Sequence, residues 1–414
     1  MKEKGSVFSR AKNRRSFLKN GIVAAGAATI GTAMLPGTPA AFAAEEDDRS
    51  PITKGDIAIL TFLQALEQVE ADLWIQYSEL GGTQDNEVSG VNGGNPAYTA
   101  ALTILDGDMP QYIHDNADDE ISHAAFLQKY LESKGASAVS LESFRHLPTS
   151  KAAGANQNFK GDGGRLTNLT QLTIDTSFWT RYRSITNPDF DVAAKFIQAT
   201  GNPDGTNSLN GGRFTAIPRS DDDTAGSDPS NPPASISARL QAIAFTAGFH
   251  FAFIEQGGTS LYPTLAQKVT NLEVLRVLLS IGPSETMHFQ TWQDKAGNAN
   301  QGNAPLSVTD PVNKSTVTFF DLHVAQGETN PESTNGDTLQ ANLIMPEPTH
   351  FLDKNFGPVA IIRPTSTLNG GAVASVQAFA DDGLFLDPAT GKNTGIVARL
   401  MHLAEAADEA RRRS

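Results

Sequence analysis

Apolar residues recur at helical spacing in four long stretches of the chain, at about residues 55–80, 110–134, 235–262 and 271–296. In the first stretch they occur on nearly every face, which is typical of a helix in the middle of a bundle. Gly81 and Gly82 predict the end of that stretch, since glycine is common just after a helix. Pro110 stands near the beginning of the second stretch, where proline fits a first helical turn. The pattern therefore predicts an all-α core of four helices.

Two regions outside these stretches lack the helical periodicity. Residues 136–234 are rich in Gly, Asn, Asp and Pro and predict a long insertion between the second and third helices. Residues 300–414 predict a C-terminal extension of unknown role, with β-branched strands near 316–324 and 359–363 and a last amphipathic helix over 396–412. The expected fold is a four-helix bundle over 44–299 with a long insertion, followed by a mixed irregular and β extension that ends in a helix.

The N-terminus has the features of an export signal. Arg14 and Arg15 precede Ser-Phe-Leu-Lys and an uncharged run that ends near Ala43, where small residues suit a signal peptidase. Glycines and prolines within the run argue against a stable membrane anchor. We expect residues 1–43 to be a twin-arginine signal peptide and the mature protein to be periplasmic or extracellular. That route carries folded proteins, often with a cofactor already inserted.

Charge and cysteine content narrow the possible functions. The formal net charge is −14, and residues 1–43 contain seven basic and one acidic side chain, so their removal brings the charge to about −20. Such an acidic chain repels nucleic acid and anionic lipid, and we expect neither as a partner. The chain has no cysteine, which excludes disulfides, thiolate metal sites and iron–sulfur clusters.

A pattern of glutamate and histidine occurs twice along the four predicted helices. The first and third helices carry Glu67 and Glu255, each directly after an apolar residue, and the second and fourth each carry Glu-x-x-His. Residues three or four apart share a helix face, so each Glu-x-x-His pair points one way, into a common core. Burying unpaired carboxylates is costly, and a pair of bound metal ions would compensate that cost. The predicted metal ligands are Glu67, Glu120, His123, Glu255, Glu285 and His288.

The bare motif is short, and its helical context carries the prediction. A third copy, Glu347 to His350, is flanked by Pro346 and Pro348, which are incompatible with a helix interior, so we exclude it. Three other side chains need an interpretation. Glu70 lies one turn from Glu67 and is either a competing ligand or a surface or capping carboxylate. His114 is expected at the surface near a helix start, and His250 is expected to face away from the site.

The order Glu, Glu-x-x-His, Glu, Glu-x-x-His resembles that of the ferritin-like superfamily, including rubrerythrin-like proteins. Residues 62–74 look like the first helix of its exported members, among them the desiccation-related group. The resemblance covers roughly 55–134 and 235–298. It implies that the six residues named above are ligands, with Glu120 and either Glu255 or Glu285 as bridges. The chain departs from the family in Trp74, where tyrosine is usual, in its long insertion, and in Gly257 and Gly258 after the third ligand.

The predicted ligand set favours iron or manganese over zinc, which prefers fewer oxygens. Two such ions can share a carboxylate and handle oxygen or peroxide between them. We therefore expect an exported di-metal oxidoreductase acting on oxygen, peroxide or ferrous iron. The alternative is a non-enzymatic stress-associated, desiccation-associated or structural protein with a vestigial or structural site. A third hypothesis is a cell-surface interaction module that functions through the insertion and the extension. The expected partner is a small molecule or metal ion, and the sequence leaves open whether the chain forms a homo-oligomer.

Overall fold

The computed structural model describes residues 51–85, 93–155, 164–170, 215–298 and 371–412, together with four short strands between 307 and 360. These residues belong to one compact unit. The predicted signal peptide and the third Glu-x-x-His motif, Glu347 to His350, lie outside the described residues. Among the described residues, no helix is both long enough and apolar enough to cross a membrane.

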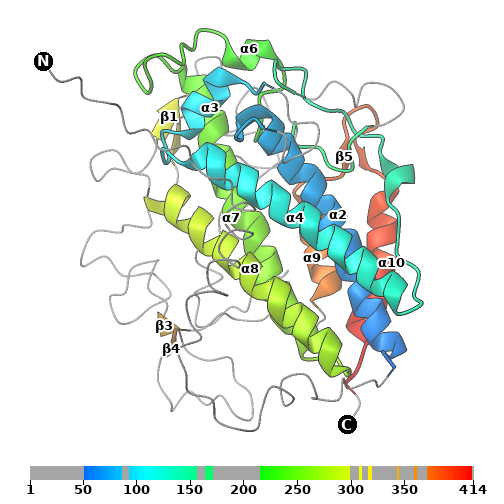
Figure 1. The fold of residues 1–414 in the computed structure, drawn as a ribbon. Helices are drawn as coiled ribbons and strands as arrows, with labels where there is room; N and C mark the ends of the chain where they lie inside the picture. The colour runs from blue at the N-terminus through cyan, green and yellow to red at the C-terminus, as the bar shows by residue number, and fades with distance from the viewer. Residues whose placement is uncertain are drawn as a thin grey trace, which may run out of the picture. The chain divides into compact units, whose positions relative to one another are not determined.

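Four long helices dominate the described residues, which confirms the all-α class (Figure 1). They are α2 (Lys54–Gly81), α4 (Met109–Ser133), α7 (Ala238–Ala266) and α8 (Leu272–Asn298). Their bounds follow the four periodic stretches closely. The largest difference is at the end of α7, which continues through Pro263 to Ala266. Proline lacks the N–H that would bond the preceding turn, so sequence alone favoured an earlier end.

Side-chain caps fix where the first helix begins. The Thr53 hydroxyl accepts from the backbone N–H of Asp56, and the Asp56 carboxylate accepts in return from the Thr53 N–H at 2.9 Å. This reciprocal capping box satisfies two N–H groups that a helix start otherwise leaves unpaired. The same carboxylate accepts from the Thr270 N–H at 2.8 Å, which ties the start of α2 to the connection between α7 and α8.

Neighbouring helices run in opposite directions. At the end of α2 the chain returns into α4, with the Thr83 N–H donating to the Pro110 carbonyl at 2.9 Å. A short connection, residues 267–271, joins α7 to α8. Tyr77, near the end of α2, bonds to His250 in the first half of α7, whereas Asp56 at the beginning of α2 bonds to Thr270, just after the end of α7. The two helices are therefore antiparallel.

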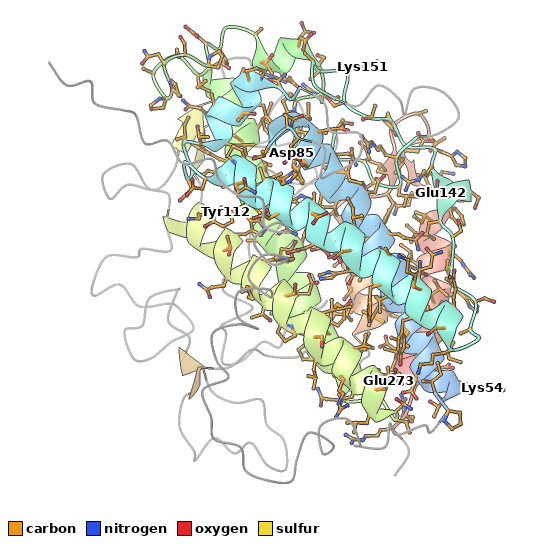
Figure 2. The ribbon with its side chains drawn as sticks, in the orientation of Figure 1. Lys54, Asp85, Tyr112, Glu142, Lys151 and Glu273 are labelled. Carbon is orange, nitrogen blue, oxygen red and sulfur yellow. The ribbon has the colours of Figure 1, made fainter. Side chains whose placement is uncertain are left out.

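Ion pairs at both ends show that α4 and α8 are also antiparallel. Lys134, just after α4, pairs with Glu273 at the beginning of α8 at 2.6 Å. Asp106, just before α4, pairs with Lys295 near the end of α8 at 2.7 Å. Figure 2 shows Glu273 and Lys54 at one end of the helix core and Tyr112 toward the other. The four helices thus form two antiparallel hairpins joined by one long connection, residues 134–237.

Two segments of the insertion are fixed to α2. Arg165 pairs with Glu79 of α2 at 2.6 Å, and both side chains are fully buried. Asp72 of α2 accepts from the backbone N–H groups of Leu166 and Thr167, both at 3.0 Å, and pairs with Arg145 at 2.6 Å. Polar residues on the outer face of α2 are therefore covered by the insertion. The insertion also contains two short elements, η1 (Glu142–Phe144) and α6 (Asp221–Thr224). A further short helix, α3 (Pro96–Leu102), lies in the connection between α2 and α4.

The end of the C-terminal extension packs on the helix core. It consists of α9 (Ala372–Asp381) and α10 (Ile396–Glu409), and α10 contacts both α2 and α9. Asp408 accepts from backbone N–H groups at the start of α9, including that of Val373 at 2.9 Å, and pairs with Lys268 at 3.1 Å. The predicted last helix is confirmed, although it ends at Glu409 and not at residue 412.

The strands of the extension are short antiparallel pairs. They are β1 (Ser307–Thr309) with β2 (Thr316–Thr318), β3 (Leu343–Ile344) with β4 (Val359–Ala360), and β5 (Leu386–Asp387) with β6 (Lys392–Asn393). The strands predicted over 316–324 and 359–363 are thus found over their first residues. The remainder of each lies outside the described residues.

Candidate metal centre

The six predicted ligands come together between the four long helices. Their ligand atoms form two groups, within each of which all atoms lie no more than 4.8 Å apart. The first, here called the His123 group, consists of Glu67, Glu120, His123 and Glu285. The second, the His288 group, consists of Glu120, Glu255, Glu285 and His288. All four carboxylates are buried, so these are groups that could hold a metal ion away from bulk water.

Glu120 and Glu285 belong to both groups. His123 Nδ1 lies 3.1 Å from Glu120 Oε2 and 3.2 Å from Glu285 Oε1. His288 Nδ1 lies 3.2 Å from Glu120 Oε1 and 3.9 Å from Glu285 Oε2. Each shared carboxylate therefore turns one oxygen toward each imidazole, the arrangement that a bridging ligand requires. Of the two imidazoles, Glu255 pairs with that of His288 alone, at 3.2 Å, so the geometry favours Glu285 over Glu255 as the second bridge.

Both imidazoles turn Nδ1 toward the carboxylates and Nε2 outward. His288 Nε2 lies 3.1 Å from Asp119 Oδ2, and His123 Nε2 lies 3.4 Å from the Ser284 hydroxyl. A histidine that binds a metal through one nitrogen commonly donates the other N–H to a carboxylate or similar acceptor, which fixes the ring. The outward contacts therefore leave Nδ1 of each ring available to a metal ion.

Sequence reasoning missed a hydrogen-bonded pair behind the carboxylates. The buried Trp292 indole donates to Asn116 Oδ1 at 2.7 Å. The Asn116 amide in turn donates to Glu120 Oε1 at 2.9 Å and to Glu255 Oε1 at 3.0 Å. Helical spacing was the available signal, because Asn116 precedes Glu120 by four residues and Trp292 follows His288 by four. Trp74, where the resemblance has tyrosine, stacks on Trp292 with ring centroids 5.3 Å apart.

Tyr262 and Gly258 of α7 complete the surroundings. The Tyr262 hydroxyl donates to Glu67 Oε1. A Cβ atom placed on Gly258 would lie 2.9 Å from Oε2 of Glu285 and 3.0 Å from its Cγ. Glycine at 258 therefore lets the α7 backbone approach a ligand of α8, which accounts for one of the two glycines that depart from the family pattern.

Three carboxylate oxygens at the centre make no hydrogen bond. They are Glu67 Oε2 and both oxygens of Glu285. Their nearest imidazole nitrogens are Nδ1 atoms at 3.2 to 3.9 Å, and a single Nδ1–H cannot serve several oxygens at once. Buried acceptors without donors are costly, so the cavity has the oxygen-rich character that suits a cation.

Burial and charge shift the pKa values of these groups in opposite directions. Burial raises the pKa of Glu67 to about 7, although the nearby imidazole of His123 opposes the rise, and burial also raises the pKa of Glu255. Burial alone would lower the pKa of His123, but its contacts with Glu120 and Glu285 outweigh this and raise it. The pKa of His288 is raised in the same way by Glu255 and other carboxylates.

The charges at the centre would not balance within the protein if every carboxylate there were ionised. Glu70 adds a fifth buried carboxylate to the four ligands, against two imidazoles. With all five ionised and both imidazoles protonated, three carboxylates would have no matching positive charge, and burial raises the pKa values of Glu67, Glu70 and Glu255 accordingly. With both imidazoles neutral, the four ligand carboxylates would match two divalent cations. The donor set therefore fits a pair of such ions.

The other candidates from the sequence have different outcomes. Glu70 is 2 % exposed and so is not a surface carboxylate; burial and the charge of Glu67 raise its pKa, and it belongs to neither metal group. The predicted surface position of His114 is wrong, since it is 1 % exposed and lies 3.6 Å from Asp85 where the chain returns past the start of α4. His250 faces away from the ligands as expected and bonds to Tyr77 at 2.5 Å.

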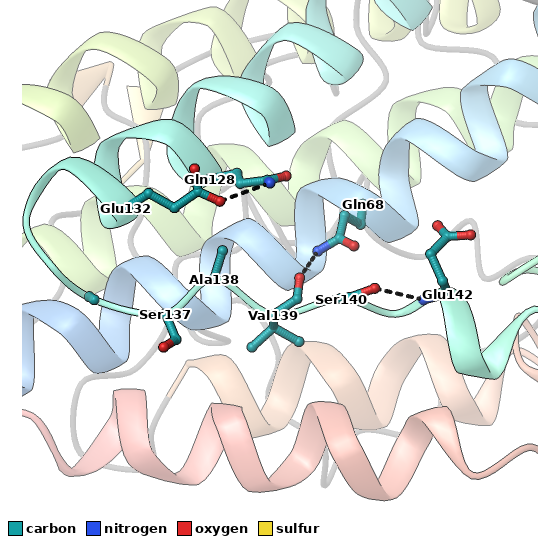
Figure 3. Close-up of a pocket in the computed structure, with 9 residues that line it drawn as sticks. Gln68, Gln128, Glu132, Ser137, Ala138, Val139, Ser140 and Glu142 are labelled. Atoms are coloured by element: carbon teal, nitrogen blue, oxygen red, sulfur yellow. Dashed lines mark hydrogen bonds between the residues drawn. The ribbon is translucent and has the colours of Figure 1, made fainter.

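A cavity of about 580 Å³ lies elsewhere, beneath residues 136–142 (Figure 3). Gln68 on its wall donates to the Val139 carbonyl at 2.9 Å. None of the six ligands lines this cavity.

No protein-family model, curated protein or solved structure matches this chain. No relative therefore supplies a function for this chain.

Proposed function

We propose that this chain is an exported ferritin-like protein whose four long helices bind two iron or manganese ions, and that it is an oxidoreductase acting on oxygen, peroxide or ferrous iron. One observation carries the proposal: two overlapping groups of ligands, each with one imidazole, share the carboxylates of Glu120 and Glu285. A single metal ion would not require two such groups, whereas a pair of ions bridged by carboxylates would.

The arrangement of the helices supports the same proposal. Ferritin-like bundles consist of two antiparallel hairpins with one long connection, and they take a Glu from each of two helices and a Glu-x-x-His from each of the other two. Here α2 and α7 supply Glu67 and Glu255, and α4 and α8 supply the Glu-x-x-His pairs. Each antiparallel hairpin therefore supplies three of the six ligands.

Each side chain has a distinct part in this proposal. Glu67 and His123 would hold one ion, and Glu255 and His288 would hold the other. The shared carboxylates of Glu120 and Glu285 would contact both ions. Four carboxylates and two imidazoles suit iron or manganese, which accept more oxygen ligands than zinc does. Two such ions, when bound, would supply redox and Lewis-acid chemistry toward oxygen or peroxide. The protein residues orient the ligands and exclude water, because the carboxylates are buried.

The non-enzymatic hypothesis takes two forms. In the first, no metal binds and the ligands form a closed hydrogen-bond network. The unbonded oxygens of Glu67 and Glu285 argue against it, since a closed network would satisfy them. In the second, the ions bind but only stabilise a stress-associated, desiccation-associated or structural protein. Activity measurements distinguish that form from an oxidoreductase.

The test is oxidation by the mature protein loaded with Fe²⁺ or with Mn²⁺. We expect loaded protein to consume hydrogen peroxide or to oxidise added Fe²⁺. Glu285→Gln, which keeps the shape of a bridging ligand, should reduce the rate to background. Glu273→Gln is the matched control, because Glu273 lies on the same helix and is exposed to solvent. Metal-loaded wild-type protein that oxidises nothing would contradict the enzymatic proposal and favour the structural alternative.

Export is a separate part of the proposal and has its own test. It rests on Arg14, Arg15 and the uncharged run after them. Replacing both arginines by lysine keeps the charge and removes the signal. The variant should remain in the cytoplasm with residues 1–43 attached. Export of this variant at the normal level would contradict the twin-arginine route.

A further inference from the structure

We infer that the two metal positions are unequal: the position of the His288 group fills first and holds its ion more tightly, because Asn116 and Asp119 hold its ligands in place. The inference rests on the proposed function, since it assumes that metal ions bind at this centre. It adds an order of binding and names the side chains that set it. The His123 position is then the one whose ion exchanges.

The first difference between the groups is the amide of Asn116. Its two N–H bonds reach Glu120 Oε1 and Glu255 Oε1, and both residues belong to the His288 group. The side chain thereby links carboxylates from two helices, α4 and α7. Carboxylates fixed before the metal arrives lose little freedom on binding it, so the position is preorganised.

Asn116 is itself held in place. Trp292 donates to its carbonyl oxygen, and the Trp292 ring is 1 % exposed. That ring packs against Trp74 and Phe251, with centroids 5.3 and 4.7 Å away. The bond from Trp292 also fixes which end of the Asn116 amide faces the carboxylates, since an indole N–H can only donate. The donors of Asn116 are therefore directed at Glu120 and Glu255.

The second difference lies behind the imidazoles. His288 Nε2 faces a carboxylate oxygen of Asp119 at 3.1 Å, whereas His123 Nε2 faces a neutral hydroxyl, that of Ser284, at 3.4 Å. A carboxylate behind a histidine fixes the ring and makes it a stronger ligand, and removing such a partner typically weakens metal binding by about 10- to 100-fold. His288 should therefore bind its ion more tightly than His123 does.

The His123 group has fewer such contacts. Its own carboxylate, Glu67, is oriented by the Tyr262 hydroxyl through Oε1 alone. Glu67 Oε2, the oxygen that faces His123, makes no hydrogen bond. In the part of the chain that the structure describes, no amide links two carboxylates of this group as Asn116 does for the other. Its ligands must therefore be ordered by the ion when it binds.

The experiment is a stepwise titration of metal-free protein with Mn²⁺, followed by electron paramagnetic resonance. We expect the first equivalent to give the signal of a single Mn²⁺ ion and the second to give the signal of a coupled pair. The first dissociation constant should be at least about 10-fold lower than the second. A coupled signal that grows from the first addition would overturn the inference, because both positions would then fill together.

Variants assign the order to the residues named. Asn116→Ala and Asp119→Asn should each weaken the first step by about 10- to 100-fold and leave the second largely unchanged, so that the two steps merge. Glu273→Gln is the control and should preserve both steps, because Glu273 is exposed and belongs to neither ligand group. Trp292→Phe keeps the packing and removes the donor to Asn116; it should shift the first step in the same direction if Asn116→Ala fails to fold.

Each remaining outcome has one meaning. Weakening of the second step instead of the first by Asn116→Ala would reverse the order and overturn the inference. Two unequal steps that none of the variants changes would also overturn it, because the named side chains would not be the cause. Wild-type protein that binds no Mn²⁺ would overturn the proposed metal centre itself, which separates that failure from a failure of the inferred order.

Discussion

Gly258 on α7 lies directly against the carboxylate of Glu285 on α8. A Cβ atom at Gly258 would come within 2.9 Å of Glu285 Oε2 and 3.2 Å of its Cβ. Glycine inside a helix costs about 1 kcal/mol relative to alanine, so a glycine here needs a compensating function. The contact supplies one, since only a residue without a side chain leaves room for the shared ligand.

Gly258→Ala should therefore impair metal binding more than folding. The added methyl group should displace Glu285 and weaken metal binding by at least about 10-fold, with a loss of stability of about 1–3 kcal/mol from overpacking. The neighbouring Gly257→Ala is the control, because its nearest atom would be Phe379 Cζ at an ordinary 3.6 Å. That variant should be neutral or more stable by up to about 1 kcal/mol. Equal metal affinity in both variants, measured by titration, would show that the contact has no effect on the site.

Asp72 should be essential for holding the insertion on α2. Asp72→Asn keeps the size of the side chain but removes the charge that pairs with Arg145 and places N–H donors near the Leu166 and Thr167 N–H groups. Breaking one partner of a buried pair costs about 3–5 kcal/mol, and denaturant unfolding should show a loss in that range. Asp106→Asn, which breaks the more exposed pair with Lys295, should cost about 0–1 kcal/mol. Similar small losses in both variants would contradict this account.

His250 should make the protein less stable in acid. Burial lowers the pKa of His250 from its ordinary 6.5 to about 3. Between these values the unfolded chain binds a proton that the folded protein excludes, so this contribution is complete above pH 6.5 and is lost as pH falls toward 3. The slope attributable to one such group is at most about 1.4 kcal/mol per pH unit.

Comparing the pH dependence of the unfolding free energy between wild type and His250→Gln isolates the contribution of His250. Glutamine still offers an acceptor to the Tyr77 hydroxyl but takes up no proton in this range. Unfolding free energies should be measured with a chelator between pH 7.5 and 5, so that metal binding does not contribute. The variant should lose less stability than wild type as pH falls. Parallel curves for the two proteins would show that His250 is not protonated on unfolding.

The four helices and the convergence of the six Glu and His side chains could be predicted because both follow from periodicity. Apolar spacing located the helices, and the Glu-x-x-His spacing put each pair on one face. Burial of polar residues was harder to predict. Glu70 and His114 are polar, and only the three-dimensional fold shows that other segments cover them. Whether Glu255 or Glu285 is shared likewise depends on how α7 and α8 approach each other, which one helix alone does not specify.

The groups behind the ligands were the least predictable. Asn116, Asp119 and Trp292 lie at helical spacing from ligands, but so do several residues that face elsewhere. Their roles arise from contacts between helices, such as that of Trp292 on α8 with Asn116 on α4. The sequence marked Gly257 and Gly258 as unusual within a helix, but it did not show that Gly258 faces Glu285 of another helix. Contacts of this kind require knowledge of which helices are neighbours.

The central claim is that these ligands hold two metal ions, and metal content tests it most directly. The mature protein should be purified gently, reconstituted with Fe²⁺ or Mn²⁺, and analysed by elemental mass spectrometry beside a variant carrying Glu120→Ala and His288→Ala. We predict two ions per chain in the wild type and their loss in the variant, with Glu273→Gln retaining both. Wild-type protein that remains free of metal after reconstitution, with the double variant merely less stable, would contradict the claim.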